Sequence, residues 1–302
     1  MNNIILSKKV KNALSKNLPV LALESSILSQ GMPYPESYSF AKRAENLCNK
    51  SNVTPATIAI LNGVIHVGLE NKQLKFVCKD ESIKKTSKRE LGIAISQKWN
   101  CSTTVSSSVH IAHLCGIKVF STGGIGGVHR GYSSNHDVSQ DINALSKNPI
   151  IVITAGPKAV LNINKTVEIL ESSGITSIGF KTNEYPSFYS VNSGVFGLER
   201  INSAKEIVDV YLNNLNLGLN SSVLVSNPIP KAYEVPFDKI NTIIFNACEK
   251  AKEEKIKGKE LTPFLLKEVS LLTEGKSLEV NICLALNNIQ LGIRVLKKLF
   301  EL

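Results

Sequence analysis

Segments typical of strands and of helices alternate along almost the whole chain, and this alternation limits the possible fold more than any other feature. Short apolar runs at 18–23, 148–155 and 222–226 predict buried strands, while amphipathic stretches at 35–50 and 204–215 predict helices. Strands that alternate with helices assemble into a mostly parallel sheet with helices on both faces. The sequence therefore predicts an α/β fold with three layers, α/β/α.

One hairpin makes the expected central sheet mixed rather than wholly parallel. The dipeptide Asn62-Gly63 stands between two apolar runs and favours a type I′ turn between antiparallel strands. At about 238–302 the pattern predicts helices only, with breaks near Gly258 and Gly275. No linker, repeat or low-complexity segment divides the chain, so we expect a single domain over residues 1–302.

Composition excludes several classes of protein. The formal charge of +10, from 35 Lys and Arg against 25 Asp and Glu, attracts anions, either through a solvated lysine-rich surface or at a site for a small phosphate ester. The basic residues are scattered and aromatic residues make up only 6%, so we expect no nucleic acid partner. Because no apolar run reaches the roughly 18 residues of a membrane helix, and the N-terminus lacks a secretory leader, we expect a cytoplasmic protein with no membrane contact.

Lys158 follows a predicted strand in the segment Ala155-Gly-Pro-Lys-Ala159. The Gly-Pro turn after this strand predicts a helix that begins at about the lysine. Burial disfavours an ammonium ion and a helix N-terminus repels positive charge, so an amine held there loses its proton easily and becomes a nucleophile. The alternative is a lysine whose stem lies along the surface with its charge in water.

A glycine-rich segment, Ser121-Thr-Gly-Gly-Ile-Gly-Gly-Val-His-Arg-Gly131, follows another predicted strand. Glycines let backbone N–H groups approach an anion closely, and His129 or Arg130 can add charge-assisted hydrogen bonds. The spacing differs from the G-x-G-x-x-G pattern of dinucleotide-binding loops. The alternative is a tight loop with a purely structural role.

Glu24 stands at the end of the first predicted strand, 18–23. A carboxylate at the carboxyl end of a strand in an α/β sheet faces the usual ligand crevice. Partial desolvation favours the protonated form of a carboxyl group, which suits a general acid. The alternative is a solvated acid in a loop.

Two further carboxylates lie four residues apart in Asp137-Val-Ser-Gln-Asp141. They share one face if the stretch is helical. Oxygen ligands of this kind suit hard cations such as magnesium or manganese, which use one or two carboxylates and keep several waters. The alternative is a pair of acids favoured by the dipole of a helix N-terminus.

Eight segments taken together resemble a known family. They are Leu21-Ala-Leu-Glu-Ser-Ser26, Gly31-Met-Pro-Tyr-Pro35, Ser121–Gly131, Asp137–Asp141, Ala155–Ala159, Ser226-Asn-Pro-Ile-Pro230, Gly258-Lys-Glu-Leu-Thr-Pro-Phe-Leu-Leu266 and Ser277-Leu-Glu-Val-Asn-Ile282. In this order, over roughly residues 15 to 300, they are similar to the pseudouridine-5'-phosphate glycosidases, the indigoidine synthase A-like family. One such segment alone is a weak signal, whereas the set is specific.

The resemblance implies an enzyme, a glycosidase or lyase, that reversibly converts pseudouridine 5'-phosphate and water to uracil and ribose 5-phosphate. A carbon–carbon glycosidic bond offers no basic leaving atom to protonate, so a mechanism with two carboxylates suits it poorly. In the family the matched lysine, here Lys158, attacks the anomeric carbon of the ring-opened sugar and forms an imine. Glu24 matches the family's proton donor.

The resemblance also implies the rest of the site and a homotrimer. Asp137 matches the carboxylate that binds Mn²⁺ or another divalent cation. The positions that match substrate contacts are Lys85, Val105, Ser139, Gln140 and Asp141. By their charge, Lys85 and His129 are expected to hold the phosphate, while Asn281 either reads the edge of uracil or caps a helix break.

Two rival functions remain open. The first is a phosphosugar aldolase that would use Lys158 for a Schiff base of its own. The second is a non-catalytic protein that binds a phosphosugar or RNA. Two residues also depart from the family pattern: Pro157 replaces an alanine, which a helix start tolerates, and Gln140 replaces a smaller residue.

Overall fold

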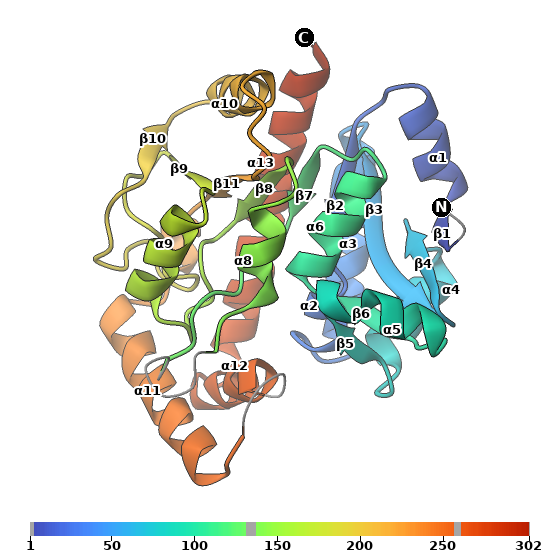
Figure 1. The fold of residues 1–302 in the computed structure, drawn as a ribbon. Helices are drawn as coiled ribbons and strands as arrows, with labels where there is room; N and C mark the ends of the chain where they lie inside the picture. Colours follow the sequence, from blue (N-terminus) through green and yellow to red (C-terminus); the bar gives the residue numbers. More distant parts are fainter. Residues whose placement is uncertain (1–2, 131–136, 257–260, 302) are drawn as a thin grey trace.

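A single sheet organises the molecule, as the computed structural model shows (Figure 1). The structure describes residues 3–130, 137–256 and 261–301. In this part of the chain the sheet has eleven strands, with the main path β1-β4-β3-β2-β7-β8-β11-β9-β10; β6 pairs with β3, and β5 pairs with β6. The strands are β1 (Ile4–Leu6), β2 (Val20–Leu23), β3 (Thr54–Leu61), β4 (Val64–Val67), β5 (Lys84–Thr86), β6 (Cys101–Thr103), β7 (Val119–Ser121), β8 (Ile151–Thr154), β9 (Thr176–Phe180), β10 (Glu199–Ile201) and β11 (Val223–Ser226).

Strand pairing is parallel except where β3 meets β4 and β6. Asn62 and Gly63 join β3 to β4, and both have positive φ angles, 49° and 73°. Positive φ at both central residues is the conformation of a type I′ turn. The predicted hairpin and the mixed sheet are therefore confirmed.

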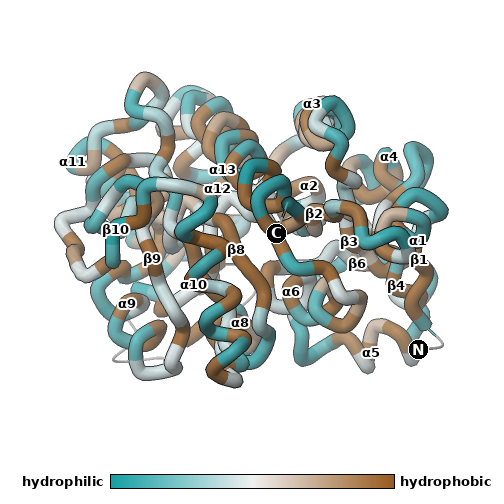
Figure 2. Tube along the Cα trace, turned by 90° about the horizontal axis from the view of Figure 1, so that it is seen from above, coloured by the Kyte–Doolittle hydropathy of each residue, from teal (hydrophilic) through white to brown (hydrophobic). Residues whose placement is uncertain are grey.

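Helices cover both faces of the sheet, as Figure 2 shows for α3 and α13 on one side of the strands and α6, α8 and α9 on the other. The helices are α1 (Lys8–Ser15), α2 (Ser26–Ser29), α3 (Glu36–Lys50), α4 (Asn71–Lys79), α5 (Leu91–Ser96), α6 (Val105–Leu114), α8 (Gln140–Leu145), α9 (Ile163–Ser172), α10 (Ala204–Asn216), α11 (Phe237–Glu253), α12 (Leu261–Leu272) and α13 (Lys276–Glu301), with short 3₁₀ turns at η1 (Lys88–Glu90) and η2 (Lys231–Tyr233). None of these described helices is long and apolar enough to cross a membrane.

The alternation of side chains along the central strands produces the three layers. Leu21 and Leu23 of β2 belong to one buried cluster, whereas Val20 and Ala22 belong to the other. Successive side chains of a strand point to opposite faces, so a strand that is apolar throughout needs a helical cover on each face. The expected α/β/α architecture is confirmed.

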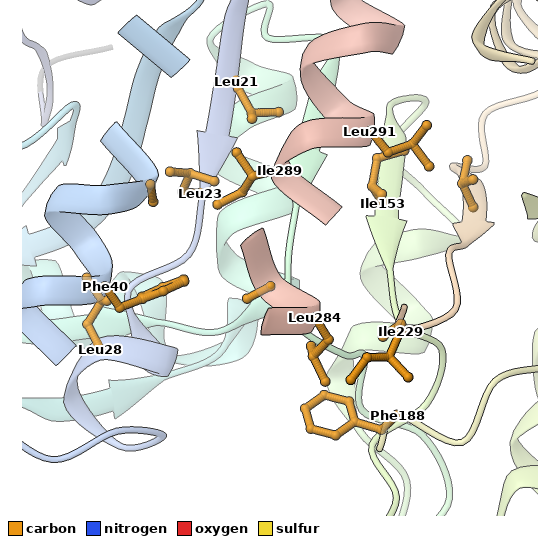
Figure 3. Packing of buried hydrophobic residues seen from close by; sticks show 14 of the residues in the cluster. Leu21, Leu23, Leu28, Phe40, Ile153, Phe188, Ile229, Leu284, Ile289 and Leu291 are labelled. Atoms are coloured by element: carbon orange, nitrogen blue, oxygen red, sulfur yellow. The ribbon is translucent and has the colours of Figure 1, made fainter. Parts of the chain in front are cut away.

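The long helix α13 lies across the middle of the sheet. Its residues Ile289 and Leu291 belong to the same buried cluster as Leu21 of β2 and Ile153 of β8, and Figure 3 shows these side chains close together. The first turns of α13 reach the edge at which β2, β7 and β8 end. The helix therefore contributes both to the core and, through Asn281, to that edge.

Two predicted helices and one predicted break are confirmed, and one predicted helix start is wrong. The predicted helices at 35–50 and 204–215 are α3 and α10. The predicted break near Gly275 separates α12 from α13, whereas Gly258 lies outside the described residues. The predicted helix start at Lys158 is wrong, because α9 begins only at Ile163, where the side chain of Asn162 caps the helix by accepting a hydrogen bond from the N–H of Lys165.

Candidate active site

The carboxyl ends of three neighbouring parallel strands bring together residues that are far apart in the sequence. Glu24 follows β2, Thr122 follows β7, and Lys158 lies four residues after the end of β8. Strands β2, β7 and β8 are adjacent, so these segments leave the sheet at the same edge. That edge is the usual ligand site of an open α/β sheet.

Glu24 is buried in a shell of hydroxyl groups. Only 5% of the residue is exposed, which excludes the alternative of a solvated loop acid. The hydroxyl of Ser26 donates a hydrogen bond to Oε2 of Glu24, and the hydroxyl of Thr122 donates one to Oε1. Both carboxylate oxygens are therefore held in place, and the direction of the side chain is fixed.

Lys158 is positioned by a loop that runs beside the glycine-rich segment. The N–H of Lys158 donates to the carbonyl of Ile125 (3.0 Å), and the N–H of Ile125 donates to the carbonyl of Gly156 (3.1 Å). Gly156 has φ +85°, and a Cβ there would stand 2.5 Å from the carbonyl oxygen of Pro186, so only glycine fits. The two loops thus continue the pairing of β7 and β8 beyond the sheet, and this pairing, rather than a helix N-terminus, places the lysine.

Four of the predicted site residues line one pocket, which we call the chamber: Glu24, Lys85, Lys158 and Asn281. They come from the end of β2, from β5, from the loop after β8 and from α13. The chamber adjoins a wider groove of about 480 Å³ that runs beside α12 and shares Asn281 with it. The fold therefore assembles a carboxylate, two amines and an amide around a space that a ligand can reach through this groove.

His129 lies beside the chamber, facing charges of both signs. The backbone N–H of His129 donates a hydrogen bond to the backbone carbonyl of Asp137 (3.0 Å). Burial lowers the pKa of His129; the negative charge of Asp137 opposes this shift, and the positive charges of Lys85 and Lys158 add to it. The imidazole of the resting protein is therefore largely neutral near pH 7. The assignment of His129 and Lys85 to a phosphate stays a prediction.

The two carboxylates of the 137–141 segment have different surroundings. Asp137 is half-buried and precedes α8, whereas Asp141 lies in the first turn of that helix and is buried. Oδ1 of Asp141 accepts from the N–H of Ser106 (2.8 Å), and Oδ2 accepts from the N–H of Gly126 (2.8 Å). The 137–141 stretch is not helical throughout, because α8 begins at Gln140, so the condition under which the two carboxylates would share a helix face is not met.

The remaining predicted residues lie around these two acids. Ser139 is the N-cap of α8, Gln140 is its first residue, and both are half-buried. Val105 is buried and begins α6, whose N-terminal backbone is tied to Asp141 through Ser106. None of these three residues lines the chamber. Their assignment as substrate contacts stays a prediction.

The glycine-rich segment borders the chamber and also makes structural hydrogen bonds, while its predicted binding of an anion stays a prediction. Gly123 and Gly124 line the chamber, whereas the N–H of Gly126 binds Asp141. Arg130 points elsewhere: its guanidinium donates to Oδ1 of Asn241 in α11 (2.8 Å) and lines a separate cavity. The end of the segment, Gly131, lies outside the described residues.

Comparison with known proteins identifies the family. The profile of the family described as "Indigoidine synthase A like protein" matches residues 9–298. The chain belongs to this indigoidine synthase A-like family. It is 44% identical to the pseudouridine-5'-phosphate glycosidase of Petrotoga mobilis over 97% of this chain and 96% of the relative, and 43% identical to that of Mycoplasmopsis agalactiae over 97% of each.

Solved structures agree with the family assignment. An indigoidine synthase A-like protein from Thermotoga maritima superimposes with a TM-score of 0.88 at 33% identity and covers 93% of each chain. The prealnumycin C-glycosynthase AlnA, solved in complex with ribulose 5-phosphate, superimposes with a TM-score of 0.91 at 26% identity and covers 100% of this chain and 98% of its own. The arrangement of strand ends described above is thus the fold of the indigoidine synthase A-like proteins.

The oxygen ligands near Asp137 fit a cation that keeps several waters better than one bound entirely by protein side chains. Among the residues that the structure describes, no three His, Cys, Asp or Glu side chains come together as a metal site. Both oxygens of Asp141 already accept backbone hydrogen bonds, so this carboxylate serves the fold. Hard cations that keep several waters are commonly bound through one or two carboxylates together with substrate oxygens, so Asp137 fits such an ion.

Sequence reasoning missed several residues that hold the family site together. Besides Ser26 and Thr122, the amide of Asn288 in α13 is fully buried and donates to the carbonyl of Thr122 (2.8 Å), while its Oδ1 accepts from Asn227 after β11 (2.9 Å). The sequence signal for Asn288 was an Asn in the middle of a long apolar helix face, because a buried amide needs hydrogen-bond partners. The hydroxyl groups of Ser26 and Thr122 gave no such signal.

Proposed function

We propose that this chain is a pseudouridine-5'-phosphate glycosidase, which reversibly cleaves pseudouridine 5'-phosphate to uracil and ribose 5-phosphate. The observation that carries the proposal is the chamber, in which a buried carboxylate, Glu24, and an amine, Lys158, line the same space. Full-length relatives with this name support it. The ribulose 5-phosphate complex of AlnA supports a phosphosugar as the ligand of this fold.

Residues that line the chamber, together with the groove of about 480 Å³ into which it opens, suit the two parts of the nucleotide. Lys85 provides positive charge for the phosphate, and neutral His129 provides a hydrogen bond. Asn281 is 5% exposed, and its Oδ1 has no hydrogen-bond partner among the described residues. An unpaired buried acceptor is costly, and an N–H group of uracil would satisfy it. Asn281 therefore reads the base, and the alternative of a helix cap loses support.

The chemistry follows from an amine next to a proton donor. Glu24 delivers the proton that O4' takes up when the C1'–O4' bond opens, and Nζ of Lys158 bonds to C1'. The C1'–C5 bond then breaks: C5 of uracil takes a proton, and the nitrogen lone pair forms the imine with C1'. Water hydrolyses the imine to ribose 5-phosphate and restores the amine of Lys158.

A divalent cation such as Mn²⁺ completes the proposed site. Asp137 would hold it, and when bound the ion would neutralise negative charge on the phosphosugar. The cytoplasmic location and the homotrimer that the resemblance implies belong to the same proposal. Sedimentation equilibrium tests the trimer, since a mass of one or two chains contradicts it.

The decisive experiment combines an assay with chemical trapping. The purified protein should release uracil from pseudouridine 5'-phosphate, and borohydride added with ribose 5-phosphate should leave a reduced ribosyl phosphate adduct on Lys158, located by peptide mass spectrometry. Lys158→Ala should abolish turnover and labelling, whereas Lys147→Ala, at an exposed lysine, should change neither. Release of glyceraldehyde 3-phosphate from deoxyribose 5-phosphate, without uracil release, would favour an aldolase. No adduct on Lys158 would contradict the mechanism.

A further inference from the structure

A second, smaller cavity lies behind Glu24. Its walls are mainly apolar, and Figure 3 shows Leu23, Phe40 and Ile289, which are three of them. The cavity shares Glu24 and Gly123 with the chamber. Its volume of about 20 Å³ is enough for one water molecule and too small for a nucleobase.

Two strand hydroxyls border this cavity on either side of Leu23. Leu23 of β2 pairs in register with Thr57 of β3 and with Ser121 of β7, and all three line the cavity. Ser121 is 3% exposed, and its hydroxyl has no hydrogen-bond partner within the described part of the chain. A buried hydroxyl without a hydrogen-bond partner is unfavourable, so a ligand that bonds to Ser121 is favoured.

The hydrogen bonds of Glu24 explain why its proton needs a further partner. The hydroxyls of Ser26 and Thr122 each donate to one carboxylate oxygen, which is the arrangement that suits the ionised form. A proton donor must also exist in the protonated form, in which one oxygen carries a hydrogen and needs an acceptor. A water molecule can donate to the carboxylate and accept from the carboxyl group.

We propose that the cavity behind Glu24 binds one ordered water molecule, which is held by the hydroxyl of Ser121 and forms a hydrogen bond to Glu24 in both of its protonation states. Thr57 closes the site on the other side of Leu23. Ser121 is then a positioning residue that acts on the reaction through this water. The functional part of the inference rests on the proposed glycosidase activity, whereas the water site itself does not.

The site is tested first by a crystal structure of the resting protein at a resolution that shows ordered water. We expect density in the cavity at hydrogen-bond distance, about 2.7–3.2 Å, from Oγ of Ser121 and from a carboxyl oxygen of Glu24. A cavity without density, or one filled by a rotated side chain, overturns the proposal. This result does not depend on whether pseudouridine 5'-phosphate is the substrate.

The effect on the reaction is tested with Ser121→Ala and a matched control, Ser226→Ala. Ser226 ends β11, is 1% exposed, and its hydroxyl also has no partner in the described chain, yet it does not line this cavity or the chamber. Ser121→Ala should lower kcat about tenfold, less than the loss of a general acid itself, with KM changed by less than about twofold. It should also alter the solvent deuterium isotope effect on kcat.

The outcomes separate the two proposals. Equal behaviour of Ser121→Ala and Ser226→Ala overturns the positioning role of Ser121. If Ser121→Ala folds poorly, Thr57→Val serves as the second variant, because it replaces the second hydroxyl by a methyl group of similar shape. A wild-type kcat and a wild-type isotope effect in Thr57→Val would contradict the proposed role of the water. A wild-type protein that releases no uracil rejects the glycosidase, while the water density still decides the site.

Discussion

The two sides of the chamber are built in different ways. The acid wall is Glu24 together with Ser26 and Thr122, whose hydroxyls donate to its carboxylate; it is buried and stands at the ends of two strands. The charged wall, made of Lys85 and Lys158, is half-buried and comes from a short outer strand and a loop. The comparison teaches that the proposed proton donor is held by the core, whereas the groups proposed to contact the phosphosugar lie on an outer strand and a loop, where adjustment to a ligand is easier.

The strongest test of the acid wall removes its proton while keeping its shape. Glu24→Gln retains an oxygen that accepts from Ser26 or Thr122, so the fold should persist while kcat falls by about 10²–10⁴. Steady-state release of uracil measures the loss, and Glu171→Gln, at an exposed acid of α9, is the control. Near wild-type turnover in Glu24→Gln would contradict the proposal that Glu24 is the proton donor.

The next largest effect concerns stability and separates the two acids of one segment. Asp141→Ala should lower the free energy of unfolding by about 2–4 kcal/mol, because the N–H groups of Ser106 and Gly126 lose a charged acceptor. Asp137→Ala should change it by less than about 1 kcal/mol, as is usual for partly exposed residues. Denaturation in urea measures both. Equal losses would show that Asp141 does not anchor the glycine-rich segment.

A smaller effect would sharpen the role of Asp137 next to the charged wall. After treatment with a chelator, the wild-type protein should regain activity as Mn²⁺ is added, while Asp137→Ala should no longer respond. The expected loss at saturating substrate is on the order of 10–100-fold, as for disturbed metal sites. Asp209→Ala, at an acid that pairs with Lys205 on the surface, should respond like the wild type. An identical Mn²⁺ titration curve for Asp137→Ala would contradict the assignment.

The smallest predicted effect acts outside both walls. Burial lowers the pKa of half-buried His66 and His110 in the folded protein. The unfolded chain therefore binds more protons than the folded one, and the free energy of unfolding should decrease as the pH falls below about 6.5. The change should stay below about 1 kcal/mol, because solvent screens half-exposed groups. Urea denaturation at pH 7.5 and 5.5 measures it, and His110→Asn should show a smaller decrease than the wild type.

Strand periodicity and turn chemistry were enough to predict the framework of the site. Glu24 was found because it ends an apolar run, and the Asn62-Gly63 turn made the sheet mixed as expected. The start of α9 was misplaced because Pro157 suggested a first helical turn. The residue that caps the helix is Asn162, a standard N-cap residue directly before Ile163. Local sequence patterns therefore predicted the helices and strands, and two competing helix-start signals, Pro157 and Asn162, explain the one wrong boundary.

The surroundings of each predicted side chain could not be read from the sequence. Asp137 and Asp141 looked equivalent, yet one is buried against backbone N–H groups of α6 and of the glycine-rich segment, which are 35 and 15 residues away along the chain. Thr122 was overlooked because it lies 98 residues from Glu24 along the chain and reaches it only when the ends of β2 and β7 come together. Such contacts depend on tertiary packing, for which periodicity carries no information.

The position of α13 in the chain has a consequence for biosynthesis. Asn281 and Asn288, which complete the chamber and tie down the end of β7, lie in the helix that leaves the ribosome after every strand of the sheet. Until α13 emerges, Leu21 and Ile153 lack their apolar cover. The nascent chain therefore exposes hydrophobic surface of the kind that chaperones bind. Catalytic competence should thus arise late and in a single step, when the last helix docks.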